Sequence, residues 1–428
     1  MRNNKNEQLF IFFIYEQNIE KMKRIKLLFA ALAAFSACAA FGAGYQIVEQ
    51  GADNMGTAMA GATVNANNSA SAAFWNPSAM SFADLQVGEG LLSAGGFAVL
   101  PSLSMRDQGS SGMMGDGKNG NCDVDSYVPN FYAGYKFAED FIATLSITAP
   151  WGLESKYASN WFGHNQGIRS FLLTADINPS VAWKVNDWLS ICGGVSAQYG
   201  FCSLSQWVPL ADYTLKLKGD SWSVGGNIGF TIQYAEDGRF GFMWRSAVDH
   251  TLKGHAYING NKMYSIKADM HMPDTFTIGF YQRLRGDFNM FAVMADYSFI
   301  RWSVFEDLTV KGLPQGVSIK EDWEDTSRVS LGLHLYAIED LILRLGVCYD
   351  ESPVRSPKHR TPRIPCADRL WISCGAGYTY ENWTFDIAYT YIFVFGNREI
   401  DRNENGVHLK GEYAAHINVI GVSASYKF

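Results

Sequence analysis

The chain has 428 residues, of which 47% are hydrophobic and 14% aromatic, and its formal net charge is −7. The acidic balance argues against a nucleic-acid partner. Beyond residue 42 no apolar run reaches the roughly 18 residues that a membrane-spanning helix needs, so a helical membrane protein is excluded. The many hydrophobic residues and glycines suit a large secreted β-protein or a transmembrane β-barrel.

The N-terminus predicts export. Met22 is followed by basic residues, by an apolar run over 27–40 and then by small residues, which is the layout of a secretory signal peptide. Cleavage is expected after Gly42, and residues 1–21 form an upstream extension if Met22 is the true start. A lipoprotein signal at Cys38, whose preceding residues match poorly, and an uncleaved anchor are the alternatives.

Short turns and alternating segments organise the rest of the chain. Six short turns recur about every 50 residues, each flanked by segments that alternate apolar and polar side chains. They lie at 138–140, 185–187, 236–238, 285–287, 338–340 and 381–382. Long polar stretches join the other ends, which predicts antiparallel hairpins. The expected strands are 87–104, 127–137, 140–150, 169–185, 188–202, 221–235, 239–256, 269–284, 287–305, 325–337, 340–350, 368–380, 383–396 and 414–428.

Fourteen strands satisfy the even number that a closed bacterial barrel requires. Leu173 and Val181 are expected on one face of their strand, and Asp176 on the other. A secreted β-sandwich has the same alternation but buries its apolar face, and it is the alternative. The chain ends on an aromatic residue, Phe428, which resembles the C-terminal signal that the barrel assembly machinery reads. The sequence therefore predicts an all-β, 14-stranded antiparallel transmembrane β-barrel in the outer membrane of a Gram-negative bacterium.

Residues 43–86 do not fit the strand pattern. They are rich in Ala, Asn, Gly and Ser and show no alternation. The lumen of a fourteen-stranded barrel is wide enough to hold such a segment. We therefore expect an N-terminal hatch over 43–86 inside a barrel formed by 87–428.

Several stretches, in sequence order, carry a family resemblance. They are Asn76-Pro77-Ser78 (Ser78 where the family has Ala), APWGLESKYASNWFGH (149–164, with His164 for Arg), DINPSVAWKVND (176–187), WRS (244–246), LKG (252–254), MPDTFTIG (272–279), DWEDT (322–326), YDESPV (349–354) and RIPCADRLW (363–371, with Cys366 for an acid). Together they resemble the FadL family of outer-membrane transporters for long-chain fatty acids and other hydrophobic compounds, over essentially the whole mature length.

The resemblance implies a barrel closed by a hatch that admits apolar molecules by diffusion. External loops would capture the ligand, an interior pocket would bind it, and a gap in the wall at the third strand would release it sideways into the membrane. The hatch motif is then Asn76, Pro77 and Ser78.

Pro179 interrupts a strongly alternating strand. It cannot donate a backbone hydrogen bond to a neighbouring strand, so pairing there must be broken or bulged. Since the third strand, 140–150, is the partner of this one, we expect Pro179 to mark the neighbourhood of the lateral window. An ordinary bulge near the periplasmic rim is the alternative.

Ligand contacts are expected in two places. The outward loops hold apolar residues that solvent-exposed loops normally avoid, and such a surface at a barrel mouth predicts capture of an apolar ligand, with packing between loops as the alternative. These residues are Trp151, Tyr157, Trp161, Phe162, Trp207 and Leu210. Apolar side chains expected to point inward indicate a greasy lumenal pocket: Ile142, Met294, Ile300, Ile417 and Val419.

Two cations are candidates for an acidic head group in that pocket. Arg245 and Arg344 are expected to point inward, where a guanidinium binds a carboxylate well. The alternative for each is a lumenal ion pair with Asp296 or Asp350.

Residues 401–412 have the spacing of a calcium loop, but strands flank them and position eight is His408. Asp401, Asn403, Asn405 and Glu412 are thus a weak metal candidate, and the segment reads mainly as the last external hairpin loop. The six cysteines beyond the signal have no CxxC spacing, and no nucleophile elbow, phosphate loop or zinc spacing occurs. We expect neither catalysis nor a cofactor.

The sequence favours a monomeric passive importer of hydrophobic molecules, most simply long-chain fatty acids, surrounded by outer-membrane lipid. A surface adhesin or receptor that displays loops on the barrel is the main alternative. An outer-membrane lipid hydrolase is the third, and it lacks a clear Ser/His pair on the predicted lipid face.

Overall fold

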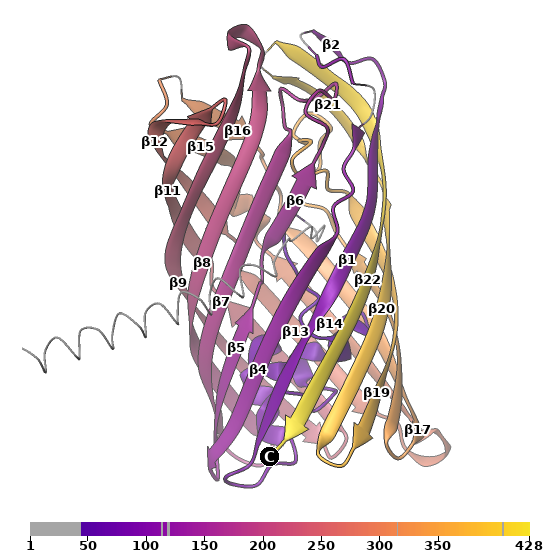
Figure 1. Cartoon of the computed structure of the whole chain (residues 1–428). Coiled ribbons are helices and arrows are strands. Elements are labelled where there is room, and N and C mark those ends of the chain that lie inside the picture. The colour runs from indigo at the N-terminus through magenta and orange to yellow at the C-terminus, as the bar shows by residue number, and fades with distance from the viewer. Residues whose placement is uncertain (1–43, 113, 118–119, 315, 405) are drawn as a thin grey trace, which may run out of the picture.

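The computed structural model describes residues 44–428 except 113, 118–119, 315 and 405, so the predicted signal peptide lies outside the described residues. The chain forms a closed antiparallel β-barrel (Figure 1), which confirms the predicted fold. Its wall has fourteen crossings, named staves here, each made of one strand or of two collinear strands. The last stave pairs with the first from Leu91 with Lys427 to Asp107 with Gly411. Among the described residues, no helix is long and apolar enough to cross a membrane.

Three staves consist of two collinear strands. In chain order the staves are β1 (Gly90–Asp107), β4 (Ser126–Ala138), β5 (Phe141–Thr148) with β6 (Gly152–Lys156), β7 (Arg169–Lys184), β8 (Leu189–Val208), β9 (Tyr213–Ala235), β10 (Gly238–Arg245) with β11 (Val248–Ile258), β12 (Asn261–Met272) with β13 (Thr275–Arg283), β14 (Phe291–Ile300), β17 (Thr326–Ile338), β18 (Leu341–Asp350), β19 (Asp368–Tyr380), β20 (Trp383–Phe395) and β22 (Val407–Lys427).

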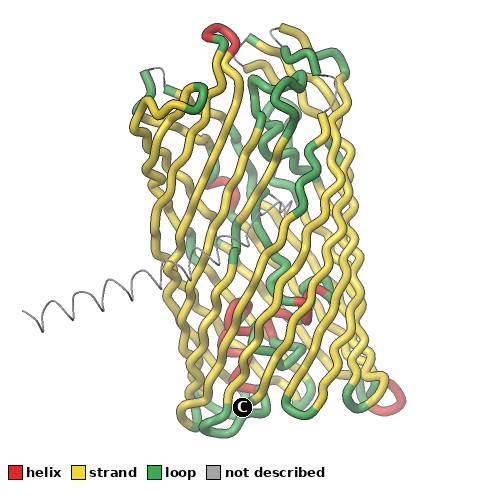
Figure 2. Tube along the Cα trace, viewed as in Figure 1, coloured by secondary structure: helices red, strands yellow, loops and turns green. Residues whose placement is uncertain are grey.

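The predicted short turns and the C-terminus share one end of the barrel, and the long loops lie at the other (Figures 1 and 2). The long loops contain β2 (Ser111–Gly112), β3 (Gly120–Asn121), β15 (Asp307–Lys311), β16 (Val317–Lys320), β21 (Glu399–Glu404), η3 (Pro209–Ala211) and η5 (Trp302–Val304), while η4 (Gly286–Phe288) lies in a short turn. By the rule for bacterial barrels the long-loop end is external. The predicted strand beginnings at 221 and 414 were too late, because β9 and β22 continue into paired external hairpins.

The two faces of the wall differ as the alternation predicts. Val181, Val224 and Leu345 are 46%, 74% and 57% exposed on the outer face. Asp176 and Thr231 are buried on the lumenal face. An apolar outer surface around a polar interior suits lipid on the outside.

Residues 44–86, named here the plug segment, lie inside the barrel (Figure 2). It contains α2 (Ala52–Met55), η1 (Ala62–Val64), α3 (Ala72–Trp75) and η2 (Pro77–Phe82). The helix α2 contacts β19, β20 and β22, and η2 contacts β7, β8 and β9. The plug segment therefore touches opposite parts of the wall.

Side chains from the wall hold the plug segment through polar contacts. The Asp296 carboxylate accepts hydrogen bonds from the backbone N–H groups of Gly61, at 2.5 Å, and Thr63, at 3.1 Å. The Arg344 Nε donates to Asn67 Oδ1 at 2.9 Å, and Arg344 Nη1 lies 2.6 Å from the buried carboxylate of Asp386. The polar lumenal face thus satisfies backbone groups of a segment that has little regular structure of its own.

Gly346 is a point where the wall comes close to the backbone of the plug segment. A methyl group at this position would lie 2.1 Å from the carbonyl carbon of Thr57. We expect Gly346→Ala to force the plug segment away from the wall at a cost of about 1–3 kcal/mol. The expected result is a lower unfolding temperature and a raised ion conductance in planar bilayers.

Gly193→Ala is the control, because its new methyl group would come no closer than 3.8 Å to another residue. Unchanged conductance and stability in Gly346→Ala would show that the plug segment is not held closely at this point.

Candidate functional site

A cavity inside the barrel, between the plug segment and the wall, is the candidate site. It contains about 710 Å³ of space between protein atoms, part of it open to the surroundings. The residues lining it come from the start of the plug segment, from α3 and from the upper parts of seven staves.

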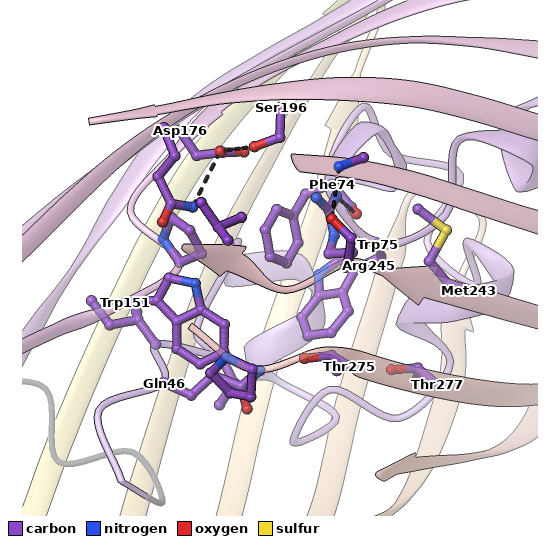
Figure 3. Close-up of a pocket in the computed structure, with 18 of the residues that line it drawn as sticks. Gln46, Phe74, Trp75, Trp151, Asp176, Ser196, Met243, Arg245, Thr275 and Thr277 are labelled. Atoms are coloured by element: carbon purple, nitrogen blue, oxygen red, sulfur yellow. Dashed lines mark hydrogen bonds between the residues drawn. The ribbon is translucent and has the colours of Figure 1, made fainter. Parts of the chain in front are cut away.

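Aromatic side chains form much of its apolar surface. Phe74 and Trp75 project from α3, with ring centroids 5.3 Å apart and planes at 90° (Figure 3). Trp151 faces them from the third stave, and Ile47, Val48, Met243 and Val248 add aliphatic surface. This lining suits a hydrocarbon ligand.

Two arginines line the same cavity. The Arg245 guanidinium stacks over the Phe74 ring at 4.2 Å and donates to the Phe74 carbonyl oxygen (Figure 3). The Arg328 guanidinium donates to Gln46 Oε1 at 3.0 Å and to Ser298 Oγ at 3.1 Å. In the described part of the chain neither forms an ion pair with a carboxylate, whereas Arg344 does.

Asp176 is the acidic residue that lines the cavity. Its carboxylate accepts hydrogen bonds from Ser196 Oγ and, at 3.3 Å, from Gln198 Nε2. Two guanidinium groups against one carboxylate leave the lining with a net positive charge of one. The cavity can therefore hold an amphiphile with an apolar body and an anionic head.

The third stave is interrupted beside this cavity. Its pairing with β4 stops where Phe131 meets Ile147, and above that rung Ser126 to Asn130 of β4 pair with β1 alone among the described strands. The stave resumes as β6, which pairs with β7. The wall ladder is therefore open between β4 and β6.

The plug segment supplies the missing backbone partner at this break. Ile47 N–H donates to the Pro150 carbonyl oxygen at 2.9 Å, and Gly152 N–H donates to the Tyr45 carbonyl oxygen at 2.9 Å. On the other side, Thr174 N–H donates to the Trp151 carbonyl oxygen at 3.0 Å. The start of the plug segment thus takes the place that a neighbouring wall strand has elsewhere.

Asn76, Pro77 and Ser78 lie where η2 meets β9. Asn76 is the N-cap residue and Pro77 takes the first helical position, where a missing N–H costs nothing. The Asn76 amide donates to Thr63 O at 3.0 Å and to Thr231 Oγ1 at 3.1 Å, and its oxygen accepts from Ser78 Oγ at 2.7 Å. The motif therefore joins two parts of the plug segment to the wall.

The plug segment also holds two buried carboxyl groups. Burial raises the pKa of Glu49 to about 7, although the Val48 N–H donates to it at 3.0 Å. Burial, followed by the charge of Asp386, raises the pKa of Asp53. Neither residue lines the cavity, so these carboxyl groups bear on the packing of the plug segment rather than on ligand contact.

Pro179 is not at the break in the wall. It pairs with Leu145 of β5, while the register between β7 and β8 skips Asn178 and Pro179. Pro179 thus interrupts pairing on the side facing β8 and is exposed toward lipid. The longer interruption, between β4 and β6, lies on the opposite side of the third stave.

The aromatic residues predicted for external capture are placed differently. Trp151 lines the interior cavity. Tyr157, Trp161 and Phe162 are buried, and the Tyr157 and Trp161 rings stack at 4.1 Å. They form the core of the packed loops rather than an exposed surface, because their rings pack against one another. Trp207 is partly exposed and stacks on His164 at 4.5 Å, and the side chain of Leu210 in η3 lies outside the described residues.

The seven residues predicted to line a lumenal pocket are inward, but the structure separates them. Arg245 alone lines the cavity described above. Ile142 and Met294 pack against the plug segment, and Arg344 is committed to Asp386, not to Asp296 or Asp350. Ile300, Ile417 and Val419 belong to the main apolar core. The alternation of apolar and polar residues predicted correctly that these side chains point into the lumen. It carried no information about how far along the barrel axis each side chain lies.

The two carboxylates of the weak calcium candidate pair with neighbouring side chains. Asp401 accepts from His408 Nε2 at 2.6 Å, and Glu412 pairs with Arg398 Nη2 at 2.9 Å, across the β21–β22 hairpin. Asn403 is exposed, and Asn405 lies outside the described residues. Within the described chain no group of three or more His, Cys, Asp or Glu residues is arranged to hold a metal ion.

Several cavity residues were missed from the sequence. Phe74 and Trp75 directly precede the Asn-Pro motif. Their place beside that motif could have indicated that they belong to the site. Arg328 and Asp176 follow from inward alternation in their strands, but nothing local indicates that they share a cavity with Gln46.

The fold and the cavity define an outer-membrane barrel whose lumen is filled by its own N-terminal segment and holds an apolar pocket. A family model described as outer membrane protein transport protein (OMPP1/FadL/TodX) matches residues 33–428. The chain therefore belongs to this family, whose members are transport proteins for hydrophobic compounds rather than enzymes, and it is an outer-membrane protein.

The sequence relatives match this chain over 90% or more of their own lengths. The chain is 27% identical to a 47 kDa outer membrane protein of Pasteurella multocida, over 95% of this chain and 99% of the relative. It is 26% identical to a long-chain fatty acid transport protein of Escherichia coli, over 86% and 90%. Among solved structures, a Pseudomonas aeruginosa FadL homologue superposes with a TM-score of 0.82 at 23% identity, covering 90% of this chain and 99% of that one.

We expect Asn76→Leu to loosen the plug segment, since it keeps the branched shape of the side chain but removes several buried hydrogen bonds, at a cost of about 1–3 kcal/mol. Cys192 is a native reporter, because its buried Sγ lies 3.5 Å from Asn76 Oδ1. In a variant with Cys192 as the single cysteine, a water-soluble maleimide should label Asn76→Leu faster than the parent.

Ser81→Ala is the matched control, because Ser81 Oγ makes a hydrogen bond to the neighbouring Ser190 at 2.8 Å but is not part of the Asn76 network. Equal labelling rates in Asn76→Leu and Ser81→Ala would contradict an anchoring role for Asn76.

Proposed function

We propose that the protein carries long-chain fatty acids across the outer membrane by diffusion, through the lumenal cavity and out between β4 and β6. The observation that carries the proposal is the pair of cavity arginines, Arg245 and Arg328, which outnumber the one carboxylate of the lining, Asp176, and lie beside aromatic and aliphatic side chains. A fatty acid matches both features, because its carboxylate pairs with a guanidinium and its chain covers apolar surface. The names of the Escherichia coli relatives support the same substrate class.

Release is proposed to follow movement of the plug segment. Tyr45 and Ile47 pair with the open edge of the third stave, and Gln46 and Ile47 line the cavity, so a ligand that displaces this stretch frees that edge. Two consecutive non-glycine residues, Ala58 and Met59, hold left-handed backbone conformations with φ of 51° and 67°. Such conformations cost about 1–2 kcal/mol each, which lowers the cost of rearrangement.

Polar side chains lie beside the proposed exit. The amide of Asn130 and the hydroxyl groups of Ser146 and Thr148 are buried without hydrogen-bond partners among the described residues. A carboxylate that passes them could accept hydrogen bonds otherwise unmade. This supports an exit for an amphiphile rather than for a pure hydrocarbon.

An aromatic hydrocarbon is the second candidate. Phe74, Trp75 and Trp151 surround the cavity with rings, and a planar ligand can stack between them. Such a ligand has no carboxylate for the arginines to bind. Variants of Arg245 and Arg328 therefore distinguish the two candidate ligands.

Assembly is proposed to use the C-terminus of a monomer. Phe428 joins the closing seam, where its N–H donates to the Gly90 carbonyl oxygen at 3.0 Å and its ring stacks on Tyr135 at 6.3 Å. Its ring is 45% exposed on the outer wall, where assembly machinery and lipid can reach it.

We expect Arg245→Gln with Arg328→Gln to weaken oleate binding about 10- to 100-fold, because two charge-assisted contacts are lost. Binding of oleyl alcohol and of toluene should change little. Arg301→Gln is the control, since Arg301 pairs with Asp274 at 3.0 Å outside the cavity. Fluorescence displacement on the detergent-purified protein measures all three ligands, and equal losses for oleate and oleyl alcohol would exclude a carboxylate site.

The exit is tested by uptake of labelled oleate into cells that lack their own carrier. Asn130→Trp should fill the space beside the break and lower uptake while oleate binding in detergent persists. Asn130→Ala, which leaves the space open, should transport normally. Normal uptake through a folded Asn130→Trp barrel would place the exit elsewhere.

A further inference from the structure

The outer wall carries a row of aligned residues on five neighbouring strands near its external end, and three of the five are lysines. β9, β11, β12 and β15 form a flared sheet there, beside β8 (Figure 1, upper left). The pairing register aligns one residue from each strand at a single height: Phe201, Asp220, Lys253, Lys267 and Lys311. All five line one open groove.

This row faces outward rather than into the lumen. On β9, Leu215 and Leu217 are buried inside the sheet, whereas Lys218, Asp220 and Trp222 alternate with them on the other face. Trp222 is 56% exposed and continues into the lipid-facing Val224. The lysines therefore project from the outside of the barrel wall.

The protein neutralises only part of the positive charge of the row, through Asp220 opposite Lys253 and Asp269 beside Lys311. Lys311 Nζ lies 3.4 Å from Asp269 Oδ2, but Lys218, Lys253 and Lys267 form no ion pair within the described chain. Lys253 and Lys267 are directly opposite each other, as are Lys267 and Lys311. Like charges at directly opposed positions repel, so the arrangement is unfavourable until an anion binds between them.

Aromatic residues fix the height of the row relative to the membrane. One rung nearer the membrane centre, Tyr199 pairs with Trp222, and their ring centroids are 5.5 Å apart. Such aromatic girdles lie at the interface between acyl chains and head groups. The lysines thus stand at the depth of the head groups of the external leaflet.

We propose that this groove binds the phosphate groups of a phosphorylated lipid of the external leaflet. Lysine ammonium groups bind phosphate oxygens as point charges, while Tyr199, Phe201 and Trp222 contact the acyl chains below. A soluble anionic partner would be expected at the barrel mouth, whereas this row lies on the side wall against lipid. The site is separate from the lumenal cavity, with which it shares no lining residue.

The test measures binding of fluorescent diphosphorylated lipid A to the purified protein in nonionic detergent micelles. Replacing Lys253, Lys267 and Lys311 together by Gln should weaken binding about 100-fold at low ionic strength. Replacing the same three by Arg should retain it, because the charge remains. The matched control replaces Lys320, Lys358 and Lys410 by Gln, which removes equal charge from the external end outside the groove.

Three outcomes would overturn the proposal. One is unchanged lipid binding in the folded triple Gln variant, with folding judged by the heat-modifiable mobility of the barrel on gels. Another is equal binding of the dephosphorylated lipid. The third is competition by inorganic phosphate at concentrations as low as those of the lipid, which would indicate a site for the free anion. Oleate binding should be unchanged in the Gln variant, so the result is independent of the proposed transport function.

Discussion

The need to pair every backbone N–H and C=O group within lipid is the constraint on which the structure depends. A closed ladder of fourteen staves meets it over most of the wall, although the register is interrupted at Pro179 between β7 and β8, and on β9 between Asp220 and Asn227. The ladder is also open along the upper third stave. There the chain uses its own N-terminal segment, with Tyr45 to Ile47 paired to Pro150 and Gly152. The partner at the break is thus a piece of the plug segment rather than another strand, and it can leave without opening the rest of the barrel.

Closure of a barrel this wide creates a lumen that side chains from the wall cannot fill. The plug segment fills it, and the wall is adapted to receive it. Asp296 and Arg344 supply hydrogen bonds to its backbone and side chains, and Gly346 leaves room for the backbone at Thr57. The segment has few intrinsic helix or strand signals because the wall, more than its own local preferences, determines its conformation.

The fate of each cation follows from its surroundings. In the lumen Arg344 is satisfied by Asp386, so it contributes to packing. In the cavity Arg245 and Arg328 have neutral partners and remain able to pair with a carboxylate. On the outer wall Lys253 and Lys267 face each other at head-group depth. We therefore propose that the same type of charge serves structure, ligand binding and lipid contact at three different places in the barrel.

The sequence by itself determined the barrel, because a period of two, short turns at one end and long loops at the other are local properties of the chain. It also determined which way Asp176, Ile142 and Met294 point, since direction needs only alternation. The hydrogen bond from the Tyr157 hydroxyl to the Pro362 carbonyl oxygen, the ion pair of Arg344 with Asp386 and the stacking of Arg245 on Phe74 were decided by tertiary structure alone. These contacts depend on the stagger between staves and on the path of the plug segment, which join residues far apart in the chain and leave no local pattern.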